Sequence, residues 1–263
     1  MQLCPHVPSD VKRYLASFAD LRLEDKEAHF RSYLRAVQPY KRIDAATRFL
    51  EIGTGIGWFP LLCRQKGLAC KGLEISPHLV EFARELGRRY GLEPDIEVGN
   101  IEEADIGRQQ YDVIIASSVF EHVEHWRAAL QKVYDALRPG GVLFFESTNK
   151  LSLTSGEFWL PLYGWCPNRL RYWLRRRLQG QDIMQLGIDF HQFTYPRLRH
   201  EFQRLGFARI YDRVEMADPA AVSAAWKRWV VRAAKRSRLA KAVALTFADV
   251  TRFLCLKAEL NNT

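Results

Sequence analysis

The sequence predicts an α/β fold: a mostly parallel sheet with helices on both faces, N-terminal helices and a C-terminal helical insertion. Two observations predict the sheet. Short apolar segments alternate with amphipathic ones through the first half of the chain, and a glycine-rich stretch separates the first apolar segment from the first amphipathic one. Because parallel neighbours need a crossover between them, this alternation indicates βαβ units with right-handed connections.

The chain divides into three expected parts. Residues 1–44 are expected to be helical, because apolar residues recur there at helical spacing. Residues 45–150 form the expected core, with strands at 47–52, 69–75, 95–98, 112–116 and 142–147. The remaining core elements are helices at 59–66, 77–90 and 125–137 and a turn at 138–141. Residues 151–263 are expected to cap and complete the sheet, with a helix at 194–205, strands at 207–214 and 252–259, and a basic amphipathic helix at about 221–246.

The charge of the chain is concentrated in its C-terminal part. Residues 1–157 carry 20 Lys and Arg against 22 Asp and Glu, whereas residues 158–263 carry 19 against 8. Such an excess is typical of a surface that meets an anionic partner. The five cysteines are scattered without a CxxC pair, and neither an apolar run of membrane-spanning length nor a signal peptide is evident, so a cytoplasmic location is expected.

The sharpest motif is Glu-Ile-Gly-Thr-Gly-Ile-Gly at 51–57, where the first strand should lead into the first helix. Glycines there allow positive φ and a close approach of a ligand to the backbone, and the helix N-terminus offers free N–H groups. A dinucleotide-binding GxGxxG loop would place its third glycine where Trp58 stands. The earlier glycine, Gly57, and the preceding acid, Glu51, resemble motif I of class I S-adenosylmethionine (SAM)-dependent methyltransferases.

Further segments carry the same resemblance, in particular to the ubiquinone- or menaquinone-methyltransferase-like group (type 11/23). Glu74 ends the second strand, where an acid can bind ribose hydroxyls. Asn100 stands where the family commonly has Asp against adenine, and Ile101 is expected to cover the ring. The segments 117–123, 137–141 and 191–207 are also similar. The resemblance implies a Rossmann-like fold and SAM-binding residues Glu51, Gly53, Thr54, Gly55, Gly57, Glu74, Ile75, Asn100, Ile101 and Ser117.

The chemistry expected of the site is methyl transfer. Because the sulfonium carbon of SAM is already electrophilic, the enzyme mainly orients a nucleophile and excludes water, and a base is needed only for a hydroxyl. His122 is the first candidate base, with Glu121 to orient it, and His191 is the second. Each histidine is alternatively structural. No metal is expected, because the His-x-x-His spacing at 122–125 lacks the HExxH order.

The expected acceptor is a small or lipid-like molecule, methylated at oxygen. Nucleic acid is not expected, because the segment after the fourth strand is Ser-Ser-Val-Phe rather than the Asn-Pro-Pro-Tyr type of base-amino methyltransferases, and no Pro-Cys motif occurs. An NAD-dependent oxidoreductase and a non-catalytic module that binds SAM or a membrane are the alternatives.

The basic helix at 221–246 has an apolar stripe that includes Trp226 and Trp229. Its cations lie on the other side (Lys227, Arg228, Lys235 and Arg238) or nearer the edges of the stripe (Arg232 and Arg236). A shorter segment repeats the pattern with Leu170, Trp173 and neighbouring arginines. The stripes are expected to pack on the sheet. Contact with an anionic membrane surface is the second interpretation and RNA the third.

Overall fold

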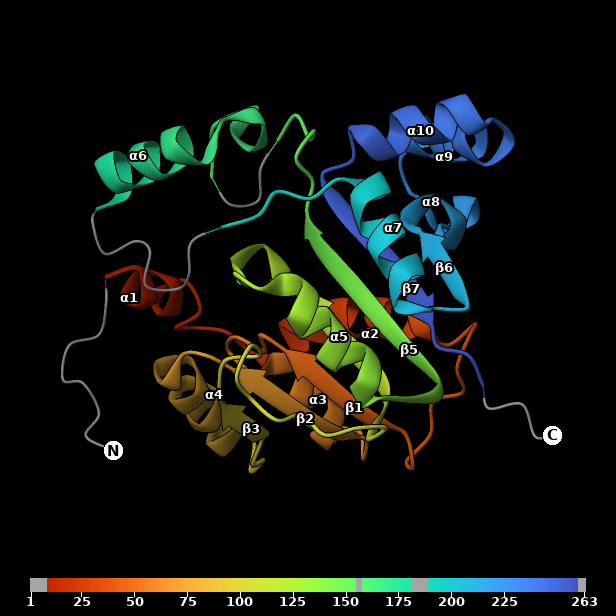
Figure 1. Ribbon diagram of the computed structural model, residues 1–263. Helices are drawn as coiled ribbons and strands as arrows, with labels where there is room; N and C mark the ends of the chain where they lie inside the picture. Colours follow the sequence, from red (N-terminus) through yellow and green to blue (C-terminus); the bar gives the residue numbers. More distant parts are fainter. Residues whose placement is uncertain (1–8, 155–157, 181–188, 260–263) are drawn as a thin grey trace.

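The computed structural model describes residues 9–154, 158–180 and 189–259, and within them a seven-stranded sheet runs through the molecule (Figure 1). Its strands are β1 (Arg48–Ile52), β2 (Ala69–Glu74), β3 (Asp95–Val98), β4 (Tyr111–Ser117), β5 (Leu137–Thr148), β6 (Arg209–Asp212) and β7 (Val250–Leu256). Their order is β3-β2-β1-β4-β5-β7-β6, and β7 alone runs against its neighbours. The mostly parallel Rossmann-like sheet expected from the sequence is confirmed.

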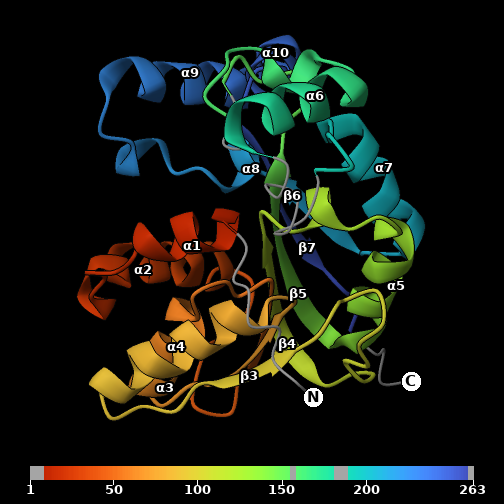
Figure 2. The same ribbon diagram turned by 90° about the vertical axis from the view of Figure 1, so that its left-hand side faces the viewer.

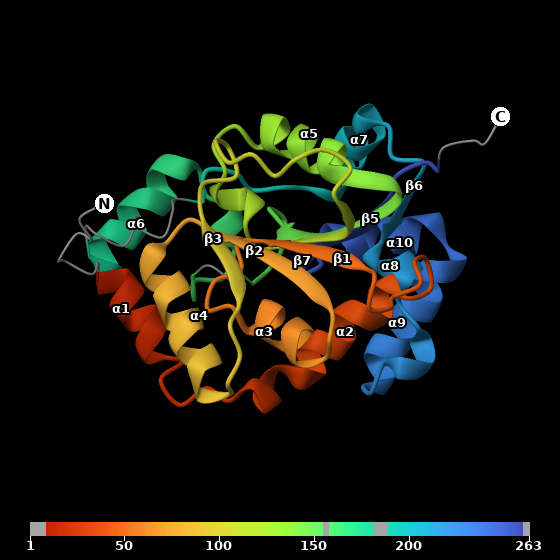
Figure 3. The ribbon, with the colours of Figure 1, turned by 90° about the horizontal axis from the view of Figure 1, so that it is seen from below.

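Helices cover both faces of this sheet, as Figure 3 shows from below. One face carries η1 (Leu23–Lys26), α2 (Glu27–Val37) and α3 (Trp58–Gln65), with α4 (Pro77–Arg89) beside them near α1 (Ser9–Ala16). The other face carries α5 (Trp126–Ala136) and α7 (Tyr195–Leu205). Alternate strand residues serve the two layers: Phe49 packs with α3, whereas Leu50 packs in the layer of α5.

The expected core elements are present to within about two residues, apart from the turn at 138–141. Those residues lie inside β5, where the pairing moves from Tyr111–Leu137 to Val113–Val142 and so leaves an outward bulge. Gly140 has φ +68 there, which favours glycine. The motif therefore still changes the chain's direction, but within a strand.

Three expectations for the C-terminal part need correction. The strand at 207–214 is shorter, because Asp212 caps the N–H groups of Val214 and Glu215 and starts α8 (Arg213–Met216). The last strand begins at Val250, two residues before the expected 252, and ends at Leu256. The basic helix is two helices, α9 (Ala225–Arg236) and α10 (Arg238–Thr246), because Ser237 is extended and its hydroxyl accepts from Ala240 N.

The remaining segments connect the sheet to its cap. They are η2 (Phe120–His122) after β4, η3 (Tyr163–Trp165) and α6 (Asn168–Gln179) after β5, and η5 (Pro219–Ala221) before α9. Figures 1 and 2 both place α6 and the α9–α10 pair at the same end of the molecule. Among the described residues no helix is both long and apolar enough to cross a membrane.

Candidate functional site

The glycine loop joins β1 to α3 and has three glycines with positive φ. Two of them are needed for packing. A Cβ on Gly53 would lie 2.2 Å from Val119, and one on Gly57 would lie 2.4 Å from Ala83 of α4. A Cβ on Gly55 would meet just the Tyr14 hydroxyl, at 3.5 Å. The loop is therefore closed on both flanks and open at its middle, which is the shape that a ligand approaching the backbone requires.

Two buried carboxylates end the strands beside this loop. The Glu74 carboxylate accepts hydrogen bonds from Gly55 N (2.7 Å) and Ser76 N (3.0 Å). Glu51 accepts from the hydroxyl of Thr54. Burial raises the pKa of Glu51 to about 8, and burial also raises the pKa of Glu74. The structure thus brings together four residues that the sequence predicted, in one acid-lined turn.

The loops after β2 and β3 lie next to each other, because Gly99 N donates to Glu74 O at 2.9 Å. Ile75, directly after Glu74, is 57% exposed and offers apolar surface to a ring. Asn100 is half-buried and its Oδ1 accepts from Glu102 N (3.0 Å), which fixes the turn. Ile101 packs in the core instead. Its side chain is buried in the same apolar cluster as Leu73, and the contact with a ring expected of it stays a prediction.

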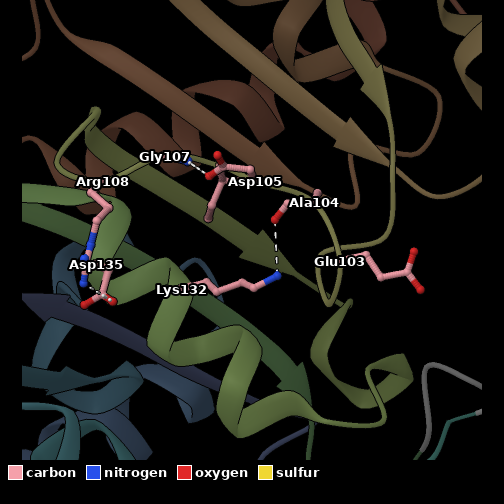
Figure 4. A pocket seen from close by; sticks show the side chains of 8 residues that line it. Glu103, Ala104, Asp105, Gly107, Arg108, Lys132 and Asp135 are labelled. Atoms are coloured by element: carbon pink, nitrogen blue, oxygen red, sulfur yellow. Dashed lines mark hydrogen bonds and ion pairs between the residues drawn. The ribbon is translucent and has the colours of Figure 1, made fainter.

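A cavity of about 350 Å³ lies on the far side of this turn, between the loop 103–108 and α5 (Figure 4). Its cations are occupied: Lys132 donates to Glu102 O (2.5 Å) and to two further carbonyls, and Arg108 pairs with Asp135 (3.3 Å). Both cations at this cavity are therefore engaged in contacts within the chain. Lys132 holds the turn after β3 in position.

The loop after β4 brings the expected catalytic residues to the carboxyl edge of the sheet. Glu121 is fully buried and accepts a hydrogen bond from Ser147 of β5 at 2.6 Å. This bond anchors η2, on which His122 is half-buried. Ser118 has φ +56, a strained value for a non-glycine residue and one that is concentrated at functional sites. Ser117 lies within 3.4 Å of Glu146 on β5.

His191 reaches the same loop from the segment before α7. Its backbone N donates to Glu121 O (3.1 Å), and its ring Nε2 lies 2.9 Å from Glu124 O. Because a carbonyl can only accept, Nε2 carries a proton in this contact. The ring also packs edge-on against Trp126. These contacts fasten the segment to the loop, so a structural role accounts for His191 without a part in the chemistry.

Three residues near the site were not predicted from the sequence. Tyr14 of α1 lies over Gly55, and its pKa is raised by burial and by the nearby Glu74 and Glu51. Tyr33 of α2 hydrogen-bonds Ser117, and burial raises the pKa of its phenol. On β5, Glu146 pairs with Arg252 of β7. A lone acid in an otherwise apolar strand was a visible signal for Glu146, whereas nothing local marks the two tyrosines.

The chain is similar to known methyltransferases in sequence and in fold. A family model described as "Methyltransferase domain" matches residues 9–216. The ubiquinone biosynthesis O-methyltransferase of Parvibaculum lavamentivorans is 29% identical over 191 residues, which cover 69% of this chain and 72% of that one. Its counterpart in Chelativorans is 28% identical over 170 residues, 59% of this chain and 64% of that one. A SAM-dependent methyltransferase from Archaeoglobus fulgidus has the same fold, with a TM-score of 0.57 at 17% identity over 93% of this chain and 99% of that chain.

Proposed function

The chain belongs to the class I SAM-dependent methyltransferases, and from this premise we propose that it transfers a methyl group to an oxygen atom of a small or lipid-like acceptor. The relatives are named as O-methyltransferases of ubiquinone biosynthesis, and the aligned regions span about two thirds to three quarters of their length. An NAD-dependent oxidoreductase is not favoured, because the family is a transferase family and Trp58 stands at the glycine position of a dinucleotide loop.

The residues proposed to hold SAM are those of the loop 53–57 together with Glu74, Ile75 and Asn100. The observation that carries the proposal is the contrast within the loop: Gly53 and Gly57 are tightly packed, whereas a Cβ on Gly55 would make an ordinary contact with the Tyr14 hydroxyl, at 3.5 Å. The Glu74 carboxylate accepts from Gly55 N, and the exposed Ile75 follows it. The Glu74 oxygens each have a lone pair beyond the backbone bonds for a ribose hydroxyl. Asn100 has an amide that can donate to a ring nitrogen, and Ser117 closes the site after β4.

When bound, SAM supplies an electrophilic methyl group. The chain's own task is to orient the acceptor hydroxyl, exclude water and remove one proton. We assign the proton to a ring nitrogen of His122, which η2 holds at the carboxyl edge of the sheet. Glu121 keeps η2 in place through Ser147. The proton of the acceptor hydroxyl would pass to His122, and the oxygen would receive the methyl group that SAM supplies, with S-adenosylhomocysteine as the leaving group.

The cofactor assignment is tested by isothermal titration calorimetry of the purified chain with SAM, S-adenosylhomocysteine and NAD in parallel. Micromolar binding of both sulfur ligands and no heat from NAD is the expected result. If the folded protein binds neither SAM nor S-adenosylhomocysteine, the assignment of the glycine loop as a SAM site is wrong.

The base assignment is tested with His122→Asn in a labelled-methyl assay against phenolic and isoprenoid-lipid acceptors. We expect kcat to fall by roughly 100-fold or more while SAM affinity stays unchanged, since general base catalysis contributes on that scale. His125→Asn is the matched control, because His125 is an exposed histidine three residues further along. Equal activity of the two variants would exclude His122 as the base.

For location and partners, we propose that the chain works in the cytoplasm and meets an anionic membrane surface through its basic C-terminal part. The support is the charge excess over residues 158–263 and the lipid-like acceptor inferred above.

A further inference from the structure

Helix α6 of the cap buries the face that its sequence pattern predicts to be exposed. Its buried side chains are Arg171 and Arg175, whereas Trp173 is 59% exposed. The cause is Asp189, a fully buried carboxylate that forms an ion pair with Arg171 and lies 3.7 Å from Arg175. Because the two arginines are one helical turn apart, drawing them inward turns Trp173 outward. The expectation that this stripe packs on the sheet is therefore wrong.

The outward face of α6 combines one aromatic ring with cations. Trp173 has Arg169 four residues before it and Arg176 and Arg177 three and four residues after it, so these side chains share one side of the helix. Leu170 and Leu178 are also exposed. The segment 158–180 contains five arginines and no acidic residue.

The helix pair α9–α10 presents the same combination independently. Trp226 and Trp229 are 67% and 71% exposed, so this stripe does not pack on the sheet either. Arg232 and Arg236 follow Trp229 at three and seven residues, on the same side. Within the described side chains of α9, Ala234 is the buried one, and on α10 Leu239 is 77% exposed. The sequence from 225 to 246 carries seven Lys and Arg and no acid.

The helices that carry these side chains, α6 and the α9–α10 pair, lie at one end of the molecule in both Figure 1 and Figure 2. We propose that α6 and α9–α10 form a docking face for the surface of an anionic lipid bilayer. Tryptophans beside arginines on amphipathic helices suit this interface, because the rings lie at the depth of the headgroups and the cations pair with anionic lipids. A packed protein partner would need complementary acidic pockets, whereas a lipid surface adapts to separated tryptophans.

The docking face is joined to the candidate active site. The chain leaves β5 at Thr148 and enters the segment that carries α6. At the end of α6, the carbonyl of Gln179 accepts a hydrogen bond from Arg13 of α1 (2.9 Å), and the neighbouring Tyr14 lies over Gly55. A bilayer against α6 would therefore bring a membrane-held acceptor close to the carboxyl edge of the sheet. This consequence rests on the proposed methyl transfer, whereas the docking itself does not.

The test is flotation of the full chain with vesicles of phosphatidylcholine, with and without phosphatidylglycerol. We expect flotation that depends on phosphatidylglycerol, falls with added salt, and is accompanied by quenching of tryptophan fluorescence by brominated lipid. Lys227→Gln/Arg232→Gln/Arg236→Gln should lower the partition coefficient by about 100-fold, since each cation near an anionic surface contributes about fivefold. Trp173→Ser/Trp226→Ser/Trp229→Ser should lower it by at least about tenfold.

The matched control is Arg84→Gln/Arg88→Gln/Arg89→Gln on α4, which removes the same net charge from a surface away from the docking face. If this control loses as much binding as the α9 variant, net charge alone is responsible and the docking face is wrong. Three results for the wild-type protein would also overturn the proposal. The protein could remain in the bottom fraction of the gradient, it could bind RNA instead of vesicles, or it could bury these tryptophans in a dimer. SAM affinity measured on the same samples separates this failure from failure of the proposed function.

Discussion

Among the glycines of the loop after β1, Gly55 differs from its neighbours in what it faces. Gly53 and Gly57 are needed because the chain packs against them, whereas in the space beside Gly55 a Cβ would meet the Tyr14 hydroxyl, at 3.5 Å. Gly55→Asp should therefore abolish SAM binding while the chain stays folded, because the carboxylate enters that space beside Glu74 and Glu51. Gly67→Asp is the control, since Gly67 has φ +72 and open surroundings on the surface after α3. Both variants bear similar backbone strain, of about 1–2 kcal/mol. Calorimetry with SAM that gives the two variants equal affinity would contradict the assignment.

Glu51 should make the free energy of unfolding depend on pH. Its pKa is raised by burial from 4.5 to about 8, so the folded state holds a proton that the unfolded state has lost. Stability is therefore highest below pH 4.5 as far as this group is concerned, and it falls as the pH rises to about 8. Glu51→Gln should remove up to about 1.4 kcal/mol of that decline per pH unit. Urea unfolding at pH 5, 6.5 and 8 measures it, with the exposed Glu93→Gln as control. Parallel profiles for wild type and Glu51→Gln would show that Glu51 is ionised in the folded chain.

At the scale of elements, the turn after β3 depends on two contacts from its surroundings. Lys132 of α5 donates to the carbonyls of Ile101, Glu102 and Ala104, and the Glu102 carboxylate accepts from His125 N at 2.7 Å. The ammonium thus satisfies carbonyls that the turn cannot pair by itself. Because Asn100 sits at the start of this turn, its position is fixed from α5, outside the expected adenine site.

Lys132→Met should therefore weaken SAM binding by about tenfold, since three carbonyls lose their donor and the turn gains freedom. Its neighbour on α5, Gln131, is exposed, and Gln131→Met is the matched control. The loss should appear equally with S-adenosylhomocysteine, which shares the adenosine, when measured by calorimetry. A variant that unfolds more easily but binds both ligands normally would show that Lys132 serves stability alone.

The elements that sequence could predict are those whose signal is local. The strands β1 to β5 are short apolar runs between glycines and helix starts. The glycine loop after β1 has a glycine at every second position from 53 to 57. The predictions that failed depend on contacts between distant residues. The strand after α7 ends early because Asp212 caps a helix. Tyr14 and Tyr33 reach the site only because α1 and α2 fold back over the sheet.

At the scale of the whole molecule, the orientation of α6 could not be predicted from the spacing of its own residues. Its leucines and tryptophan follow helical spacing, which indicates a buried stripe, and yet its arginines are buried instead. The deciding residue, Asp189, lies 18 positions from Arg171, so no local window contains both. A buried carboxylate can dictate this choice because an unpaired charge in the interior costs more than exposing apolar side chains. The exposure of Trp173 follows from that pairing.

The same pairing predicts that the cap can open while the core stays folded. Asp189→Asn leaves Arg171 and Arg175 without their buried counter-charge, and breaking such a pair costs about 3–5 kcal/mol. Tyr163, whose pKa is raised by burial to about 12, packs beneath Arg171 and would be exposed with it. We expect chymotrypsin to cleave within α6 at least about 100-fold faster in Asp189→Asn, with SAM affinity preserved because the glycine loop and Glu74 lie in the core. Asp25→Asn is the control, since it breaks an exposed ion pair with Arg22 (3.8 Å), a kind that contributes about 1 kcal/mol or less. Equal cleavage of the two variants would mean that α6 holds its orientation without Asp189, and the buried pair would then not explain the exposed tryptophan.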